Sequence, residues 1–263
     1  MKKILIKKIY VFLVLGLLSI PSTSLMAVSN PTLTPNQTAA VMGIITNFIL
    51  DDEVATLIHN GTAYGTVTSP YTERVWLDRN LGASQVCIAF NDKNCYGDYY
   101  QWGRNWDGHE KYILENNTDI QATDINNVGH GDFISSTFAL HYDWTQVDNN
   151  GSLRSKNWSS IDGTSVCPIG FRLPSIDELV EETMSHGVVD RDTAFTNFLK
   201  LPSSGFRGSG TGELVDAGSR GNMWSSSVNR TNSSAMAYGL GFANWYLNGS
   251  RDYGRTVRCI QDY

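Results

Sequence analysis

The sequence predicts a loop-rich α+β domain with a few short antiparallel strands and about three helices. From residue 61 onward, short alternating apolar runs are broken by Gly, Asn, Asp or Ser about every 8–12 residues, which indicates short strands. A helical pattern interrupts them near residue 175, whereas residues 108–156 show almost no periodicity. A stretch that long without a pattern is typical of a loop-rich fold or a functional surface.

The composition excludes several classes of protein. The 263 residues include 20 Lys and Arg against 26 Asp and Glu, and only 17% of the chain is charged, compared with roughly 25% in an average domain. The first 27 residues hold four Lys and no acid, so the rest has 16 basic and 26 acidic residues, a net charge of −10. This balance argues against a nucleic-acid partner. The apolar content of 41% argues against disorder.

Residues 1–27 are predicted to be a signal peptide. A basic start is followed by an uncharged apolar run over residues 9–20 and by a segment rich in small residues that ends at Ala27. The run is too short for the ~30 Å hydrocarbon core of a bilayer, although an uncleaved anchor helix is the alternative. No Cys precedes Cys87, so the lipoprotein route is excluded. We expect a secreted or cell-surface protein with no membrane span after cleavage.

Residues 28–57 are predicted to form an N-terminal helix and a linker. Thr34 resembles a helix N-cap and Pro35 a first helical residue, and apolar residues follow at largely helical spacing as far as Ile49. The main domain is then expected to span residues 58–263.

Within the main domain the pattern predicts strands at residues 74–77, around 238–247 and at 255–260. A helix is predicted to begin after Ser175, because Ser175 and Glu178 have the spacing of a capping box, and to stop at Gly187. A second short helix is predicted over residues 192–200.

Four cysteines in an exported chain favour disulfides. Three pairings are open, of which we favour Cys87–Cys95, a local link, and Cys167–Cys259, which closes a loop of about 90 residues. A zinc site is disfavoured because none of the cysteines has CxxC spacing.

No catalytic or metal-binding motif is present. The five histidines show no HExxH pair, and there is no nucleophile-elbow or complete dinucleotide-binding pattern. Residues 148–151 (DNNG) resemble part of a calcium loop but lack its acidic last ligand, so a turn is expected there. The sequence therefore specifies no cofactor.

Seven short motifs carry a resemblance to a known family. They are residues 66–71 (TVTSPY), 75–82 (VWLDRNLG), 95–103 (CYGDYYQWG), 167–174 (CPIGFRLP), 199–205 (LKLPSSG), 224–226 (WSS) and 257–260 (VRCI). In this order they resemble the Fibrobacter succinogenes major paralogous domain family, over about residues 58–263. That family is similar to the formylglycine-generating-enzyme (sulfatase-modifying-factor) branch of the C-type-lectin-like fold. The resemblance implies such a fold here, with Trp76, Trp102 and Trp224 in its core.

One departure from that branch bears on activity. Its enzymes use a pair of closely spaced C-terminal cysteines that bind copper, whereas this chain has only Cys259 near its end. We therefore expect no catalysis, with a divergent formylglycine-generating-type enzyme as the alternative. A third hypothesis is a structural component of an envelope or adhesion assembly, with residues 28–57 as the docking segment.

The resemblance points to a C-terminal binding face for a protein or glycan ligand. Tyr, Ser, Gly and Asn, which dominate residues 225–253, combine rigid aromatic area with adaptable hydrogen bonding. The candidate ligand-binding residues are Asn229, Asn232, Tyr238, Asn244, Tyr246, Asn248, Ser250, Asp252 and Tyr253. Related bacterial domains are diversified by retroelements that mutate adenines, so a variable protein is a further hypothesis. An ordinary Asn/Gly-rich pair of hairpins is the alternative. Calcium is compatible with the implied fold, but no loop specifies it.

Overall fold

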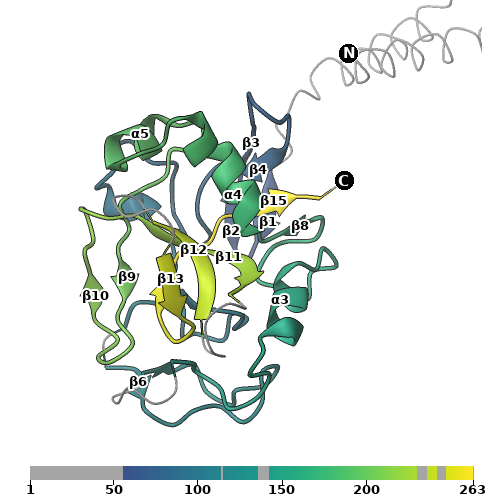
Figure 1. Cartoon of the computed structure of the whole chain (residues 1–263), viewed down its shortest axis with the longest axis vertical. Helices are drawn as coiled ribbons and strands as arrows, with labels where there is room; N and C mark the ends of the chain where they lie inside the picture. The colour runs from purple at the N-terminus through teal and green to yellow at the C-terminus, as the bar shows by residue number, and fades with distance from the viewer. Residues whose placement is uncertain (1–55, 114, 136–141, 230–235, 242–246, 263) are drawn as a thin grey trace, which may run out of the picture. The chain divides into compact units, whose positions relative to one another are not determined.

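The computed structural model describes residues 56–113, 115–135, 142–229, 236–241 and 247–262. The predicted signal peptide and the predicted helix near residues 35–49 lie outside the described residues. The described residues belong to one unit, Ala55–Tyr263. This unit confirms the α+β prediction, because it combines small, mostly antiparallel sheets and short helices with long loops (Figure 1).

One four-stranded antiparallel sheet divides the hydrophobic core. Its order is β3 (Thr66–Thr68), β4 (Val75–Leu77), β15 (Ile260–Gln261) and β8 (Phe171–Arg172). Successive side chains of a strand point to opposite faces. Accordingly, Trp76 packs in a cluster with Leu179 and Ile260, while Leu77 packs in a second cluster with Trp102 and Trp224. The strand at 74–77 is thus confirmed.

A second four-stranded sheet is also completed by the C-terminal part of the chain. Its order is β10 (Leu214–Val215), β9 (Phe206–Arg207), β14 (Gly254–Arg255) and β5 (Tyr100–Gln101). The prediction of one strand over 255–260 is therefore wrong. The chain leaves this sheet after Arg255 and reaches the first sheet at Ile260. In between, the carbonyls of Thr256 and Cys259 accept hydrogen bonds from the backbone N–H groups of Trp224 and Leu77.

Around residues 238–247 the described residues belong to two paired antiparallel strands and not to one strand. β11 (Asn222–Val228), β12 (Met236–Gly241) and β13 (Leu247–Ser250) make a three-stranded antiparallel sheet, which lies at the front of the molecule in Figure 1. Two smaller pairs complete the set. β1 (Leu57–His59) and β2 (Thr62–Tyr64) form a hairpin, and β6 (Asn117–Thr118) pairs in parallel with β7 (Phe133–Ile134).

The two helices predicted in the main domain are present. α4 (Ile176–Glu182) begins with the expected capping box between Ser175 and Glu178, and a 3-10 turn, η2 (Met184–His186), continues it to Gly187. Gly187 ends the turn in the left-handed conformation, with φ of 83°. α5 (Arg191–Thr196) is shorter than predicted, because the chain turns extended at Asn197 (ψ of 154°).

A third helix, α3 (Ser152–Trp158), lies in the stretch predicted to be a loop. The Asp148 carboxylate accepts hydrogen bonds from the N–H groups of Leu153 and Arg154 at its start. The expected turn before it is present, with Gly151 N–H donating to the Asp148 carbonyl. The helix was missed because one of its buried residues is Arg154, which interrupts the apolar pattern.

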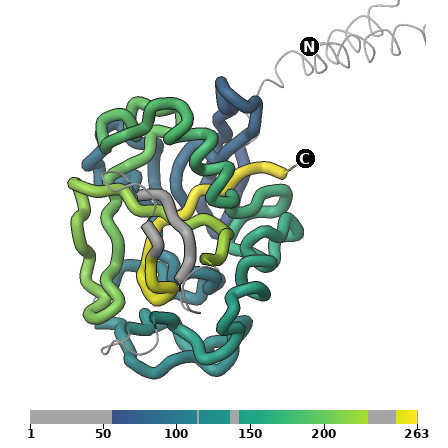
Figure 2. Tube along the Cα trace, viewed as in Figure 1, coloured from purple at the N-terminus to yellow at the C-terminus, as the bar shows by residue number. Residues whose placement is uncertain are grey.

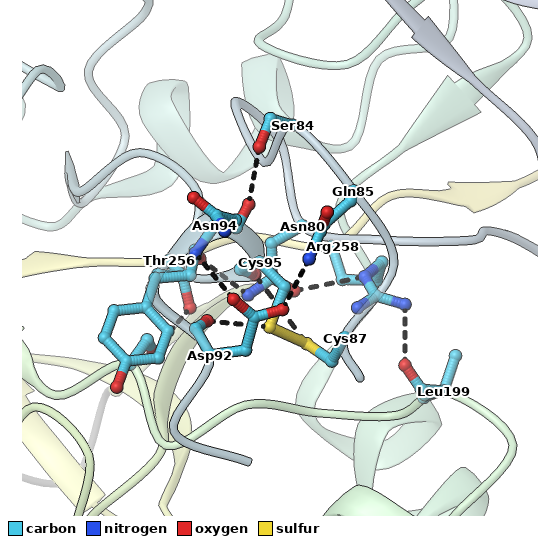
Figure 3. Close-up of a disulfide and its surroundings, with 12 residues drawn as sticks. Asn80, Ser84, Gln85, Cys87, Asp92, Asn94, Cys95, Leu199, Thr256 and Arg258 are labelled. Atoms are coloured by element: carbon cyan, nitrogen blue, oxygen red, sulfur yellow. Dashed lines mark hydrogen bonds between the residues drawn. A yellow bond between two sulfur atoms is a disulfide. The ribbon is translucent and has the colours of Figure 1, made fainter. Parts of the chain in front are cut away.

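The predicted disulfides and core tryptophans agree with the structure. Cys87 is bonded to Cys95 and Cys167 to Cys259, and Cys95 of the shorter bridge ends a 3-10 turn, η1 (Lys93–Cys95). Figure 3 shows that bridge beside Asp92, whose carboxylate accepts hydrogen bonds from Gln85 and Asn94. The side chains of Trp76, Trp102 and Trp224 are fully buried. Among the described residues, no helix has the length and apolar character needed to cross a membrane.

Candidate binding site

The predicted C-terminal site is only partly within the described structure. Asn232, Asn244 and Tyr246 lie outside the described residues, and so do the side chains of Tyr238 and Asn248, whose backbones belong to β12 and β13. For these five residues a binding role stays a prediction.

The other four candidates do not form an exposed face. Asn229, Ser250 and Asp252 are buried, with 2%, 5% and 0% of their surface exposed. Tyr253 is half-buried, packs against the core and lies with its ring 5.3 Å from that of Phe206. Three of these side chains therefore lie in the interior of the domain, and that of Tyr253 is partly covered by it.

The motif at residues 95–103 builds the support for a different site. The Gln101 side chain is fully buried, and its amide donates to the carbonyls of Ile134 (2.7 Å) and Asp252 (2.9 Å). Its oxygen accepts hydrogen bonds from Ile134 N–H and from Arg104 Nη1. One amide thus links the segment after β13 to β7 and to Arg104.

Arg104 fixes two of these loops to each other. Nε donates to Asp107 Oδ2 (2.8 Å), Nη1 to the Asp132 carbonyl (3.0 Å) as well as Gln101, and Nη2 to the His130 carbonyl (2.9 Å). The guanidinium also lies 5.6 Å from the Trp144 ring. A buried arginine bonded in this way holds residues 104–107 against residues 130–132.

A half-open hollow of about 350 Å³ lies between these loops. We call it the Trp106 hollow, and it is lined by residues 104–107 and 125–131. Both loops belong to the long connection between β5 and α3, the teal trace along the lower end of Figure 2. Gly131 is required there, because a Cβ would lie 2.6 Å from the Asp107 carbonyl oxygen. The volume is in the range of small-molecule sites.

Trp106 stands out at the rim, since 53% of its surface is exposed. The other tryptophans whose exposure the structure gives (Trp76, Trp102, Trp144, Trp158 and Trp224) are fully buried. The rest of the lining is mainly polar, including Asn105, Asn126, Asn127 and His130, with the partly buried side chains of Ile125 and Val128 as its other apolar members. An exposed aromatic ring beside amide and imidazole groups is an arrangement suited to binding.

A cluster of Asp107, His109 and Glu110 lies next to the hollow and has atoms close enough to share a metal ion. Most of its potential ligand atoms already accept or donate hydrogen bonds. His109 Nδ1 lies 2.7 Å from Asp107 Oδ1, and Nε2 accepts a hydrogen bond from Gln101 N–H. Glu110 Oε2 accepts from the N–H groups of Asp107 and Gly108. A cation at this cluster would have to displace hydrogen bonds that shape the loop.

The buried His109 makes stability depend on pH. Burial, helped by the charge of Arg104 and opposed by Asp107, lowers its pKa from 6.5 to about 4. As the pH falls, His109 therefore takes up a proton in the unfolded chain before it does so in the folded chain. Its contribution to the free energy of unfolding is complete above pH 6.5 and is lost as the pH drops to about 4.

We expect a loss on the order of 2–3 kcal/mol in the free energy of unfolding between pH 7 and pH 4 from this residue. His109→Gln, which keeps one donor and one acceptor, should flatten the profile measured by urea denaturation. His186 is exposed, and His186→Gln gives the matched control. An equal slope in the wild type and the His109→Gln variant would contradict the assignment.

Comparison of the chain with protein-family models, with curated proteins and with solved structures finds no match. The family resemblance of its motifs therefore stays a prediction. Sequence reasoning also missed the Trp106 hollow. The signal was weak: one Trp between Asn105 and Asp107, at the edge of a polar stretch without periodicity.

Proposed function

We propose that this chain is an exported, non-catalytic binding module with a C-type-lectin-like scaffold, which recognises a glycan or protein ligand. The observation that carries the proposal is the Trp106 hollow, in which an exposed indole lies above loops fixed by buried hydrogen bonds. Leaving a large aromatic side chain in water forgoes its hydrophobic stabilisation of folding. Contact with a ligand would recover part of that free energy.

The rigidity of the site supports binding over catalysis. Arg104 and Gln101 hold the loops, so little conformational entropy is lost when a ligand enters. The lining offers amides, an indole and one imidazole, a set suited to orienting a ligand. We assign no nucleophile or general base among them.

The cysteines also favour a non-catalytic role. The alternative, a divergent formylglycine-generating-type enzyme, needs free thiols that bind copper. All four cysteines of the chain are in disulfides, so neither Cys259 nor any other is a thiol. Two disulfides also favour an oxidising compartment, which agrees with export through a signal peptide to the cell surface or the medium.

Replacing Trp106 by Ala tests the proposal. We expect binding to glycan arrays or to cell-surface extracts to weaken about tenfold or more, because the variant loses its aromatic contact area. Ile169→Ala is the control, since Ile169 is 74% exposed and is not part of the hollow. Equal binding by the wild type and the Trp106→Ala variant would exclude the hollow as the site.

The C-terminal hypothesis has a separate test. A triple variant of Tyr238, Tyr246 and Tyr253 should lose binding if residues 225–253 carry recognition, as the sequence predicts. A reverse transcriptase gene beside a near-copy of the 3′ end of this gene would support retroelement diversification of that segment. Loss only in the Trp106→Ala variant would assign recognition to the hollow alone.

A further inference from the structure

We propose that the Trp106 hollow takes a neutral, hydroxyl-rich sugar unit of a glycan, with one face of the ring stacked on the indole. This inference rests on the proposed function and specifies its ligand class. It follows from the groups that remain free at the rim once the internal hydrogen bonds are assigned.

The hollow offers no cation to an anionic ligand. Arg104 is the only Arg or Lys among the residues that line it. Its side chain is 1% exposed, and its three nitrogens already donate to Asp107, Gln101 and the carbonyls of residues 130 and 132. A sulfate or carboxylate would therefore lose its hydration without gaining a charge partner.

The hollow offers no unpaired carboxylate to a cationic ligand either. Asp107 is the only acidic residue in the lining. One of its oxygens accepts hydrogen bonds from the backbone N–H and Nδ1 of His109, and the other lies 2.8 Å from Arg104 nitrogens. With a single aromatic ring and a neutralised carboxylate, the site lacks what an ammonium group requires.

Apart from the apolar side chains of Ile125 and Val128, the groups that remain in the lining are neutral hydrogen-bonding groups. The backbone N–H groups of Asn126 and Asn127 are bonded to Asp124, but within the described part of the chain their exposed side-chain amides have no hydrogen-bond partner. His130 Nδ1 accepts a hydrogen bond from Asp132 N–H, so the neutral ring carries its proton on Nε2 as a donor. An amide can both donate and accept, as a sugar hydroxyl does.

The indole supplies the apolar part of the contact. The ring face of a sugar bears C–H groups, and a planar aromatic surface gains dispersion and burial against them. An aromatic platform with amides and an imidazole at its edge therefore matches a ligand that is apolar on one face and hydroxyl-bearing at its rim.

The test uses the full-length exported protein on arrays of neutral glycans, sulfated glycans and glycans that contain uronic acids, at 50 and 500 mM NaCl. We expect binding to neutral glycans, with less than a twofold change between the two salt concentrations, because no ion pair is formed. Free neutral monosaccharides should compete. Trp106→Ala should weaken binding about tenfold or more, whereas Trp106→Phe, which keeps an aromatic face, should weaken it less.

Asn126→Asp and Asn127→Asp keep the shape of the rim but remove the donors, so each should weaken binding several-fold. Thermal denaturation must show all variants folded, which the exposure of these side chains favours. Binding confined to sulfated or uronic-acid glycans, with steep loss in salt, would overturn the neutral-sugar assignment and leave the binding module intact. If the wild type binds a protein but no glycan, and Trp106→Ala loses that binding, the neutral-sugar assignment is also overturned while the binding module stands. No binding to glycans or proteins would overturn both proposals.

Discussion

Replacement of Asp143 by Ala is expected to lower the free energy of unfolding by about 3–5 kcal/mol, a large part of the stability of a typical domain. Asp143 is 4% exposed and accepts hydrogen bonds from two buried arginines. Arg154 binds it with both terminal nitrogens, at 2.6 and 2.8 Å, and Arg251 Nη1 lies 3.0 Å from its second oxygen. The variant would keep two buried guanidinium groups and lose the carboxylate that they share.

The position of the two arginines makes the loss severe. Their guanidinium groups lie 5.3 and 5.1 Å from the ring of Trp102, which is itself fully buried. Asp148 still faces Arg154 Nε at 3.2 Å, so part of the network survives. Water cannot easily replace the missing carboxylate at this depth, and a buried charge without its partner is costly.

Equilibrium denaturation in urea measures the effect. Asp119→Ala is the matched control, because Asp119 is exposed and surface substitutions usually change stability by less than about 0.5 kcal/mol. Asp143→Asn should lie between the control and Asp143→Ala, since its amide oxygen can still accept hydrogen bonds. A loss below about 1 kcal/mol in Asp143→Ala would show that the arginines find other partners.

Features that depend on neighbouring residues could be predicted from the sequence, whereas a feature that depends on a buried arginine could not. Local signals were reliable: Ser175 and Glu178 form the capping box that their spacing indicates, because that bond depends on four neighbouring residues. The core tryptophans and both disulfides also followed from the sequence. Helix α3 did not, since Arg154 occupies a position where an apolar residue was required by the pattern.

Charge in the interior limits pattern-based prediction throughout this domain. Arg207 and Arg258 are 1% exposed, and Figure 3 shows Arg258 between Asn80 and Leu199, to which it donates hydrogen bonds. Binary patterning treats such residues as surface. Apart from the Gly212 carbonyl, which Arg207 reaches five residues on, their partners are carbonyls and an amide far away in sequence, so no spacing rule reveals them.

The candidate site was out of reach for a related reason. The motif around Gln101 could be recognised, but its role depends on residues 130–134 and 252, which only the folded chain brings together. The C-terminal candidates were chosen by composition. Composition cannot distinguish an Asn or Asp that is buried inside the domain, as Asn229 and Asp252 are, from one that faces a ligand.

Removal of the Cys167–Cys259 disulfide is expected to cost about 4–5 kcal/mol, because the bridge closes a loop with a sequence separation of 92. The double variant Cys167→Ala/Cys259→Ala avoids free thiols. The bridge also lies in the core cluster that contains Trp102 and Trp224, and Cys259 directly precedes β15 in the middle of the first sheet. Chain entropy and packing therefore act in the same direction.

The Cys87–Cys95 bridge gives an internal comparison. Its separation is 8, for which the chain-entropy model gives about 2–3 kcal/mol. Guanidinium denaturation of the two double variants should thus show the larger loss for Cys167→Ala/Cys259→Ala, and a larger loss for the short bridge would contradict the loop-length argument. The Cys87→Ala/Cys95→Ala variant should still bind, because neither cysteine lines the Trp106 hollow. The side-chain hydrogen bonds by which Gln101 and Arg104 support the hollow go to other described residues.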